Sequence, residues 1–370
     1  MKNFYPLMFL FIARLTWAEE YCVDNTQDLL NALSVVNGVN EPSHIKLVQG
    51  DYHPIHNGQG SFGVVWLHNT PHHLEISGGW LLHNGQCTED LSVANPMDTR
   101  LLGDQTVRGF DVEVGSEPLN LTLRNLSIMG GTSPPPAIAG YFTYGAGLKI
   151  QRPGQDHFVG NVVLDRLFFS ENHGYNASAL FVDGASHLLV RNSVFYHNRN
   201  YQNHSIIIHT PDDARTYFVN NFVHGNYRLN ANDPSSAASF ATQGNGQVFI
   251  ANSGFYINDV EDLHLAGDGL GAHWLVHNHY LNLAGIAPVI EVNNLNDSVI
   301  YMSNDYIPYI HSPYINAGTT PDPNLQHLFE HQWDPGELDF WGEVRNHGGG
   351  IDVGASEHRL DLVFKAAFEN

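Results

Sequence analysis

The sequence has little positive charge, very little cysteine and, beyond its first residues, no apolar run long enough to cross a bilayer. Lysine and arginine together number 16, against 38 aspartates and glutamates, so the formal net charge is −22. Nucleic acids and anionic membranes bind basic surfaces, so this balance argues against both as partners. It also argues against a polyanionic polysaccharide, unless a metal ion such as calcium bridges the charges.

The apolar stretch near the N-terminus is too short for a membrane span. Residues 1–18 begin with Lys2, continue with a mostly apolar run over residues 4–12, and end in a small-x-small pattern at residues 16–18. This order of features is typical of a secretory signal peptide. We therefore expect a secreted or cell-surface protein that begins near Glu19 after cleavage and has no transmembrane segment.

The two cysteines of the chain are Cys22 and Cys87. In an exported protein an even pair of cysteines favours a disulfide, because the extracellular environment is oxidising. We predict that a Cys22–Cys87 disulfide ties the start of the mature chain to the second or third repeat unit.

Long amphipathic helical stripes are also missing, and short apolar segments with a period of two recur instead. Seven of them share a six-residue frame, which reads apolar, any residue, Asn or Asp, two further residues, apolar. The Asn or Asp of this frame is Asn125, Asp165, Asn192, Asn220, Asn252, Asn278 or Asn304, and glycine takes its place in a weaker form at Gly50, Gly78 and Gly103. Successive positions are between 22 (from 103 to 125) and 40 (from 125 to 165) residues apart. Such a period is typical of a solenoid.

Because the segments read as strands, the repeat predicts an all-β fold, a parallel β-helix of about ten coils with one period in each coil. Stacked coils place equivalent residues about 4.8 Å apart. We expect the Asn of the frame to occupy a tight corner in the left-handed region of φ/ψ space. Its side chain would form a ladder of hydrogen bonds between coils. A second ladder is expected six residues further on, at Asn198, Asn226 and Asn258.

The segments that flank the repeat predict caps for the open ends of its apolar core. Residues 19–43 form the N-terminal cap and contain a short amphipathic helix with Thr26 as its N-cap. The coils are expected over residues 44–310, followed by a C-terminal cap over residues 311–358 and a tail over residues 359–370.

Motifs in the flanking segments resemble a known family. Residues 312–318 fit Ser-Pro-x-Ile-x-Ala-Gly, residues 339–345 fit Asp-x-x-Gly-x-x-Arg, and residues 351–357 fit Ile-Asp-x-Gly-Ala-x-Glu. This pattern resembles the closing region of secreted bacterial right-handed parallel β-helix proteins of the choice-of-anchor type, in the pectate-lyase-like superfold. Residues 76–80 and 99–103 are similar to the entry coils of the same proteins.

The resemblance implies a right-handed coil and a secreted bacterial protein, and it implies no particular reaction. The tail is similar to those of proteins secreted by some Gram-negative bacteria. Asp339, Arg345, Asp352 and Glu357 match polar positions of the family's closing region. We expect them to form a buried network of ion pairs and turns that seals the last coil.

Polar residues seven or eight positions after each frame Asn predict one column on the outside of the helix. This column reads His173, Arg199, Tyr227 and Asp259, with Arg228 beside it. In β-helical lyases a basic side chain removes a proton from the sugar, and calcium often neutralises the uronate. His173, Arg199 and Arg228 are therefore candidate catalytic residues, and the candidate metal ligands, for calcium, are Asp259, Glu261 and Asp262.

Aromatic residues near the column are candidates for stacking against sugar rings. They are Tyr141 and Tyr144 in an insertion after the early coils, and Tyr175, Tyr201 and Tyr227 beside the column. The leading hypothesis is a non-catalytic extracellular protein that binds glycan or another surface partner along one face. A polysaccharide lyase or glycoside hydrolase is the first alternative, and a structural matrix or adhesin-like protein is the second.

Overall fold

The structure of the chain is a computed structural model. It describes residues 19–39, 41–54, 62–66, 72–89, 95–105, 107–115, 118–133, 144–152, 160–202, 204–229, 238–258, 261–266, 272–296, 302–303, 306–309, 312–320, 335–345 and 350–358. The predicted signal peptide, the tail at residues 359–370 and Asn304 lie outside the described residues.

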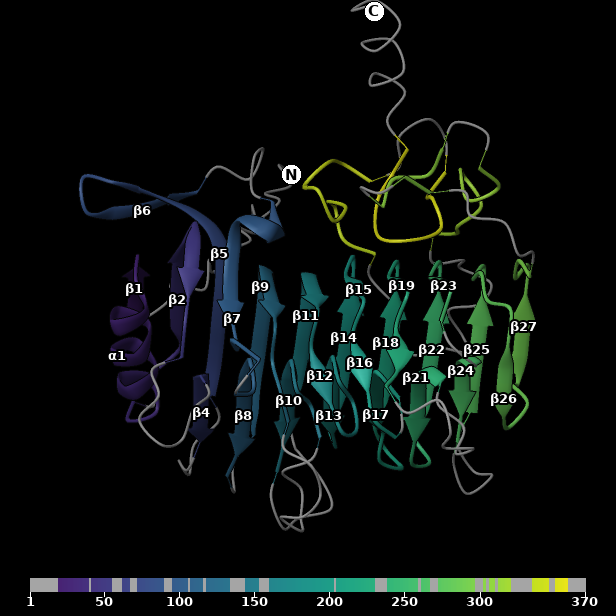
Figure 1. Cartoon of the computed structure of the whole chain (residues 1–370), viewed down its shortest axis with the longest axis horizontal. Helices are drawn as coiled ribbons and strands as arrows, with labels where there is room; N and C mark the ends of the chain where they lie inside the picture. The colour runs from purple at the N-terminus through teal and green to yellow at the C-terminus, as the bar shows by residue number, and fades with distance from the viewer. Residues whose placement is uncertain are drawn as a thin grey trace, which may run out of the picture.

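The strands form three sheets that run along a solenoid (Figure 1). The longest path contains β1 (Glu19–Val23), β2 (Ser43–Val48), β5 (His72–His83), β9 (Leu119–Met129), β11 (Asn161–Ser170), β14 (His187–Arg191), β18 (Arg215–Val219), β22 (Gln247–Ala251), β25 (Ala272–Val276) and β27 (Ile290–Val292), in that order. Strands β3 (Gly50–Tyr52), β6 (Gln86–Glu89), β7 (Thr99–Leu102), β15 (Val194–Tyr196), β19 (Phe222–His224) and β23 (Gly254–Tyr256) join the same sheet outside this path.

The second sheet contains β26 (Leu283–Gly285), β24 (Glu261–Leu265), β21 (Ala238–Gln243), β17 (Ile206–His209), β13 (Leu180–Asp183), β10 (Leu148–Gln151), β8 (Phe110–Val114) and β4 (Phe62–Trp66). The third contains β12 (His173–Gly174), β16 (Arg199–Asn200) and β20 (Tyr227–Arg228). Neighbouring strands come from successive coils and pair in parallel, as β14 does with β18, whereas β5 and β6 form an antiparallel hairpin. The predicted parallel β-solenoid is therefore confirmed.

The N-terminal end carries the predicted helix, α1 (Thr26–Val36), which packs Leu29, Leu33 and Val36 into the core. Its N-cap is Asn25 and not Thr26, because the Asn25 side chain accepts a hydrogen bond from the backbone N–H of Asp28. Strand β1 precedes the helix and was not predicted. The Cys22–Cys87 disulfide is confirmed, and it joins β1 to the hairpin strand β6.

Inward-facing side chains fill the solenoid, and aromatic rings stack from coil to coil. The rings of Phe169 and Phe195 lie parallel with their centroids 4.8 Å apart, which matches the spacing of neighbouring strands. Phe218 contacts Phe195, Phe240 and Phe255. Each fully buried side chain of this size stabilises the fold by about 1.5–3 kcal/mol, so the core is the main source of stability.

In the coils that the structure describes, the frame Asn or Asp residues form the first corner, with two exceptions. Four of them adopt the predicted left-handed conformation, with φ of 56° at Asn125, 52° at Asn192, 55° at Asn220 and 49° at Asn252. In the two other described coils the left-handed residue is Arg166 or His277, one position from Asp165 and Asn278.

The two exceptions have a physical explanation in the strand register. Asp165 pairs with Arg191, the residue before Asn192, so it still belongs to the strand. Asn278 lies one position past its corner, where its Oδ1 accepts a hydrogen bond from the N–H of Ser253 at 2.9 Å. Asparagine in this frame therefore occupies either the corner position itself or the position directly after it.

The second corner carries the inter-coil ladder that the sequence predicts. The Nδ2 of Asn198 donates to the Oδ1 of Asn226 at 2.9 Å, and that of Asn226 donates to Asn258 at 3.3 Å. Asn172 extends the ladder by one coil, because its Nδ2 donates to Asn198 at 2.9 Å. Asn198 has no exposed surface, so each lost hydrogen bond would leave a buried polar group unsatisfied.

The frame residues of the middle coils bind the C-terminal segment, a name used here for residues 312–320, 335–345 and 350–358. Asn192 donates from Nδ2 to the carbonyl of Pro335 at 2.9 Å, and Asn252 accepts at Oδ1 from the N–H of Thr319 at 2.9 Å. Gly336, with a φ of 81°, approaches so closely that a Cβ there would lie 2.8 Å from Nδ2 of Asn192. Asparagine at this corner therefore anchors a second segment, which the sequence analysis did not predict.

The C-terminal segment lies along the side of the coils and not over the last of them (Figure 1). Its Tyr314 and Phe340 share a hydrophobic cluster with Phe168 and Phe222, from coils in the middle of the solenoid. The prediction of a cap that seals the last coil is wrong in this respect. The reason is that the segment's apolar side chains pack against outward-facing aromatic residues of the middle coils.

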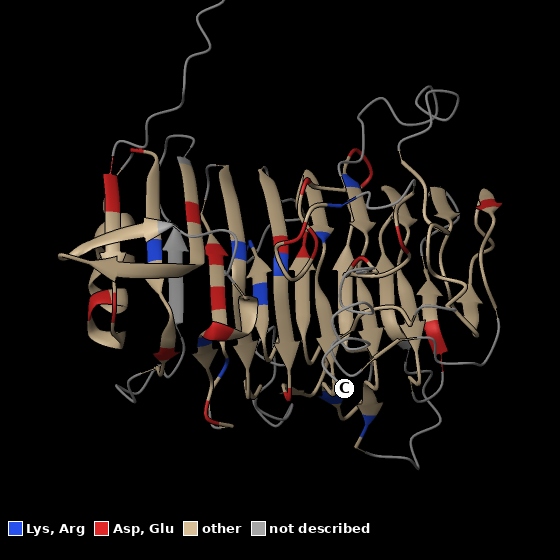
Figure 2. Ribbon diagram, turned by 90° about the horizontal axis from the view of Figure 1, so that it is seen from above, with Lys and Arg blue, Asp and Glu red and all other residues tan. Residues whose placement is uncertain are grey.

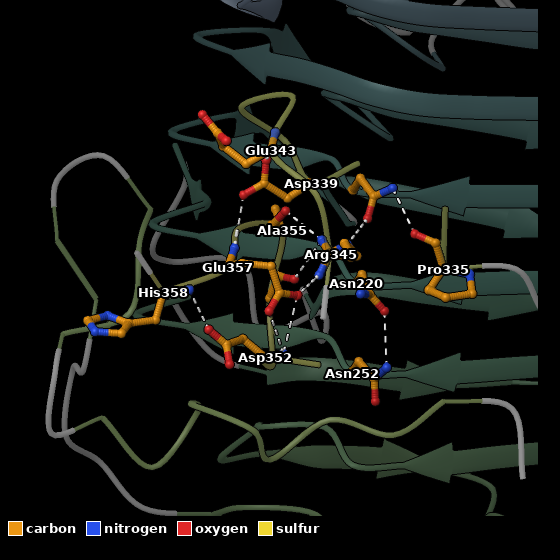
Figure 3. A network of polar contacts seen from close by, with 12 residues as sticks. Asn220, Asn252, Pro335, Asp339, Glu343, Arg345, Asp352, Ala355, Glu357 and His358 are labelled. Atoms are coloured by element: carbon orange, nitrogen blue, oxygen red, sulfur yellow. Dashed lines mark hydrogen bonds and ion pairs between the residues drawn. The ribbon is translucent and has the colours of Figure 1, made fainter. Parts of the chain in front are cut away.

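The predicted polar network is present in this segment and is buried (Figure 3). Arg345 donates from Nη1 to Glu357 at 2.7 Å and from Nε to Asn192 at 2.8 Å. Asp339 accepts from the N–H of Glu357 at 3.0 Å, and Asp352 accepts from that of His358 at 2.5 Å. One guanidinium thus faces three carboxylates, and burial raises the pKa of Glu357 to about 7 despite the attraction of Arg345.

Candidate functional site

The predicted column of outward-facing residues forms one surface, here called the corner face, on strands β12, β16 and β20. His173, Arg199 and Tyr227 occupy equivalent positions in three successive coils. Two residues further on, Tyr201 donates its backbone N–H to the carbonyl of Gly174 at 2.9 Å, so it occupies the position equivalent to that of Tyr175 in the preceding coil. Residues two apart on a strand point to the same side. The corner face therefore combines His173, Tyr175, Arg199, Tyr201 and Tyr227.

Glu171 organises the charges of the corner face. Its carboxylate lies 3.1 Å from Nη2 of Arg199, 3.5 Å from Nδ1 of His197 and 4.0 Å from Nε2 of His173. The guanidinium of Arg199 also lies 5.2 Å from the ring centroid of Tyr227, which is the geometry of a cation–π contact. A carboxylate therefore neutralises the positive charge of Arg199, and an aromatic ring orients its guanidinium group.

Glu171 reaches this position because the second corner places it there. It has a φ of 53°, and His197 in the next coil has a φ of 52°. Burial lowers the pKa of His173, and the charge of Arg199 lowers it further while Glu171 opposes the change. His173 is therefore neutral at physiological pH and can donate one hydrogen bond and accept another.

Arg228 does not share the column. It is in register with Asn200, and adjacent residues of a strand face opposite sides. The expectation that it lies beside Arg199 on one surface is therefore wrong, and Arg199 remains as the basic residue of the corner face.

The proposed calcium ligands are not assembled into a site by the described residues. Glu261 pairs with Nδ1 of His264 at 3.2 Å. Asp262 is buried and accepts hydrogen bonds from Asn258 and from the N–H of Leu281. Asp259 lies outside the described residues. Within the described ranges, no three His, Cys, Asp or Glu side chains are grouped so as to hold a metal ion.

Of the two tyrosines of the insertion, Tyr144 is described by the structure, and it does not join the corner face. Tyr144 stacks on Phe181 of β13 with ring centroids 4.6 Å apart, so it packs against the second sheet. Tyr141 lies outside the described residues.

A cavity of about 370 Å³ lies on the other side of the second corner, between strands β15 and β19 and residues 302–303 and 306–309. Its lining consists of Tyr196, Phe222, His224, Met302, Ser303, Tyr306 and Tyr309. His197 stacks on Tyr196 with ring centroids 3.8 Å apart, and its ring centroid lies 6.3 Å from that of Tyr227. The cavity and the corner face are therefore neighbours across one corner.

Sequence reasoning missed this cavity, although a signal for it exists. Tyr196, His224 and Tyr256 each occur four residues after a frame Asn, in three consecutive coils. That position points outward from the core. Three aromatic or imidazole rings in one outward column indicate a platform, but the opposite wall comes from residues at least 46 positions later, as in 302 − 256 = 46.

Basic residues elsewhere on the solenoid lie among acidic ones (Figure 2). Ion pairs join Lys46 to Glu20, Arg100 to Asp51, Arg124 to Glu75, Arg108 to Asp111 and Arg191 to Asp165. These pairs leave little basic surface for a polyanion.

The comparisons with known proteins add no family. No protein-family model matches the sequence, and a search of curated proteins finds no match. In the part of the chain that the structure describes, each helix is too short or too polar to cross a bilayer.

Proposed function

We propose that this protein is a non-catalytic extracellular or cell-surface β-helix protein that binds glycan through its corner face. The observation that carries the proposal is that successive coils place three tyrosines and one arginine on the corner face, with Tyr227 in register with Arg199 and Tyr201 equivalent to Tyr175. Tyr201 is 47% exposed, so its ring is available to a partner. The Cys22–Cys87 disulfide supports an oxidising, extracellular location.

The chemistry of the corner face suits a sugar chain. A sugar ring has apolar C–H faces that pack on aromatic rings, and tyrosine adds a hydroxyl that can hydrogen-bond at the edge. Arg199, Glu171 and neutral His173 offer both donors and acceptors to sugar hydroxyls. Because the charges of Arg199 and Glu171 cancel, we propose a neutral glycan in preference to an acidic one.

A calorimetric titration of the mature protein with neutral and acidic oligosaccharides tests this proposal. We expect a neutral oligosaccharide to bind, and Tyr201→Ala and Tyr227→Ala each to weaken it about tenfold, which is about 1.4 kcal/mol. Tyr21→Ala, at the N-terminal end of the solenoid, is the matched control and should leave binding unchanged. Absence of binding across the panel, or binding that tolerates both corner-face variants, would reject the proposal.

We propose a polysaccharide lyase as the second candidate, because Arg199 is a basic side chain held beside Glu171 and neutral His173. The test is product formation, followed through reducing ends and unsaturated-uronate absorbance with and without calcium. Product that disappears in Arg199→Ala, while oligosaccharide binding is retained, would favour the lyase. Binding without product in the unmodified protein would favour the non-catalytic function.

A further inference from the structure

We propose that the cavity between β15, β19 and residues 302–303 and 306–309 is a separate binding site for a small, uncharged aromatic molecule that carries one or two hydrogen-bonding groups. This inference does not depend on glycan binding at the corner face. The lining residues differ from those of the corner face, so the two sites can be tested one by one.

The walls of the cavity are mainly aromatic. Tyr196 and His224 have ring centroids 5.4 Å apart, and those of Phe222 and His224 are 5.6 Å apart, which makes one continuous wall on the coils. Tyr306 faces this wall, with its ring centroid 5.7 Å from that of Tyr196 at an interplanar angle of 65°. Offset and edge-to-face arrangements of this kind are favoured contacts for a further aromatic ring.

Burial divides the cavity into a floor and a mouth. Phe222 and Met302 are almost fully buried, whereas Tyr309 is 53% exposed. The thioether of methionine makes favourable contacts with aromatic rings and adapts to their shape. A cavity of about 150 Å³ is known to accommodate benzene, so the 370 Å³ available here suit a ligand of one or two rings.

The polar groups of the lining are four hydroxyls, of Tyr196, Ser303, Tyr306 and Tyr309, and the imidazole of His224, and none of its residues is an Asp, Glu, Lys or Arg. Ser303 accepts a hydrogen bond at Oγ from the N–H of Ile307 at 3.2 Å, so part of its capacity is already used. Burial, together with the nearby His197, lowers the pKa of His224 to about 4, so its imidazole is neutral at physiological pH. A carboxylate ligand would therefore lose its hydration without gaining an opposite charge.

The aromatic walls favour an aromatic molecule over a sugar. A sugar ring would bring several hydroxyls against walls made mainly of ring faces, and each hydroxyl left without a partner costs about 1–3 kcal/mol. A phenol or an indole brings one N–H or O–H group, which His224 can accept. The cavity thus selects for flat, neutral molecules with a single polar edge.

The test is ligand-observed NMR and calorimetry on the mature protein, with indole and phenol as probes. We expect both probes to bind and benzoate and a neutral disaccharide not to occupy the cavity. Tyr309→Ala, an exposed position whose loss leaves the fold intact, should weaken indole about threefold to tenfold. His224→Ala should weaken it by about tenfold or more, and Tyr227→Ala on the corner face is the matched control with no effect.

Several results would overturn the proposal. They are no binding of indole or phenol, equal binding of benzoate and indole, a disaccharide that competes with indole, or indole binding that Tyr309→Ala and His224→Ala both leave unchanged. Loss of glycan binding in Tyr227→Ala with retained indole binding would show that the two sites are separate.

Discussion

Arg199 on the corner face and Arg345 in the C-terminal segment both pair with a glutamate, but only the first pair is open to solvent. The side chains of Arg199 and Glu171 are 31% and 38% exposed, whereas those of Arg345 and Glu357 are 2% and 1% exposed. An exposed pair contributes about 0–1 kcal/mol, because water already solvates both charges. A buried pair is costly to break, since the remaining charge has no water around it.

The difference shows how one type of contact serves two purposes in this molecule. Arg345 also donates to the carbonyl of Ala355 at 2.6 Å and to Asn192, so it joins the C-terminal segment to a coil more than 150 residues earlier in the chain, as in 345 − 192 = 153. Arg199 instead faces outward beside Tyr227. The buried pair fixes the segment, and the exposed pair is available to a ligand.

The largest effect is expected from Arg345→Met. This change leaves Glu357 and two neighbouring carboxylates buried without their cation, and it should lower the free energy of unfolding by about 3–5 kcal/mol. Denaturant unfolding at pH 8, followed by tryptophan fluorescence, measures the loss. A loss below that of the equivalent Arg199 variant would contradict the contrast between the two arginines.

A smaller loss is expected from Asn220→Val, at the corner where the C-terminal segment packs. A β-branched side chain at φ 55° is strained by about 1–2 kcal/mol, and loss of buried hydrogen bonds adds about 1–3 kcal/mol. Asn220→Gly is the matched control, because it removes the same amide but tolerates the left-handed backbone. Thermal unfolding should rank the original protein above Asn220→Gly, and Asn220→Gly above Asn220→Val. An Asn220→Val protein with unchanged melting temperature would refute the corner assignment.

The pH dependence of stability should distinguish the buried pair from the exposed one. Burial raises the pKa of Glu357 from its ordinary value of 4.5 to about 7, so between these values the folded state binds more protons than the unfolded state. The contribution of Glu357 to stability is thus fully present below pH 4.5 and is lost as the pH rises through 7. Burial also raises the pKa of Asp352, which acts in the same direction.

Buried histidines oppose this trend, so a difference between two proteins is the informative measurement. Burial lowers the pKa of His44 to about 3 and that of His224 to about 4, which removes stability as the pH falls below their unfolded values. Glu357→Gln leaves the histidines in place. The stability of the original protein minus that of Glu357→Gln should therefore decrease from pH 4.5 to 7, and a flat difference would show that Glu357 does not titrate in this range.

The smallest effect is expected from Arg199→Ala. The exposed pair should contribute less than about 1 kcal/mol to stability, and this contribution should shrink further in 1 M salt, where charges are screened beyond about 3 Å. The loss caused by Arg345→Met should persist in the same salt, because the buried pair is not reached by ions. Denaturant unfolding at low and high salt measures both, and a salt-insensitive Arg199→Ala loss would indicate that Arg199 has a structural role.

Much of the fold was predictable, because it depends on local chain properties repeated many times. The fold is indicated by short apolar strands and by an Asn that recurs once in each coil. These features can be recognised without knowing which distant residues contact one another. The ladder through Asn198, Asn226 and Asn258 followed from the same repeat. The corner face was predictable in the same way, since a shared offset from the frame placed His173, Arg199 and Tyr227 in one column.

The predictions were wrong or incomplete where the place of a side chain depends on a shift of one residue along the strand. They were also incomplete where it depends on a partner far away in the chain. The shift of Asp165 and Asn278 from the corner is one residue, which the frame cannot resolve. Arg228 was misplaced because adjacent residues of a strand face opposite sides. The aromatic cavity needs Tyr306 and Tyr309 to fold back over Tyr196, and no repeat encodes that return.

The sequence by itself determined the solenoid, its two corner columns and its Cys22–Cys87 disulfide, because each depends on residue types at a fixed spacing. Only the tertiary structure decided that the C-terminal segment lies along the side of the coils, where Arg345 meets Asn192 and Tyr306 closes the cavity. Those contacts join residues far apart in the chain through the burial of particular apolar and charged side chains. A one-dimensional period carries no information about which coil such a segment will contact.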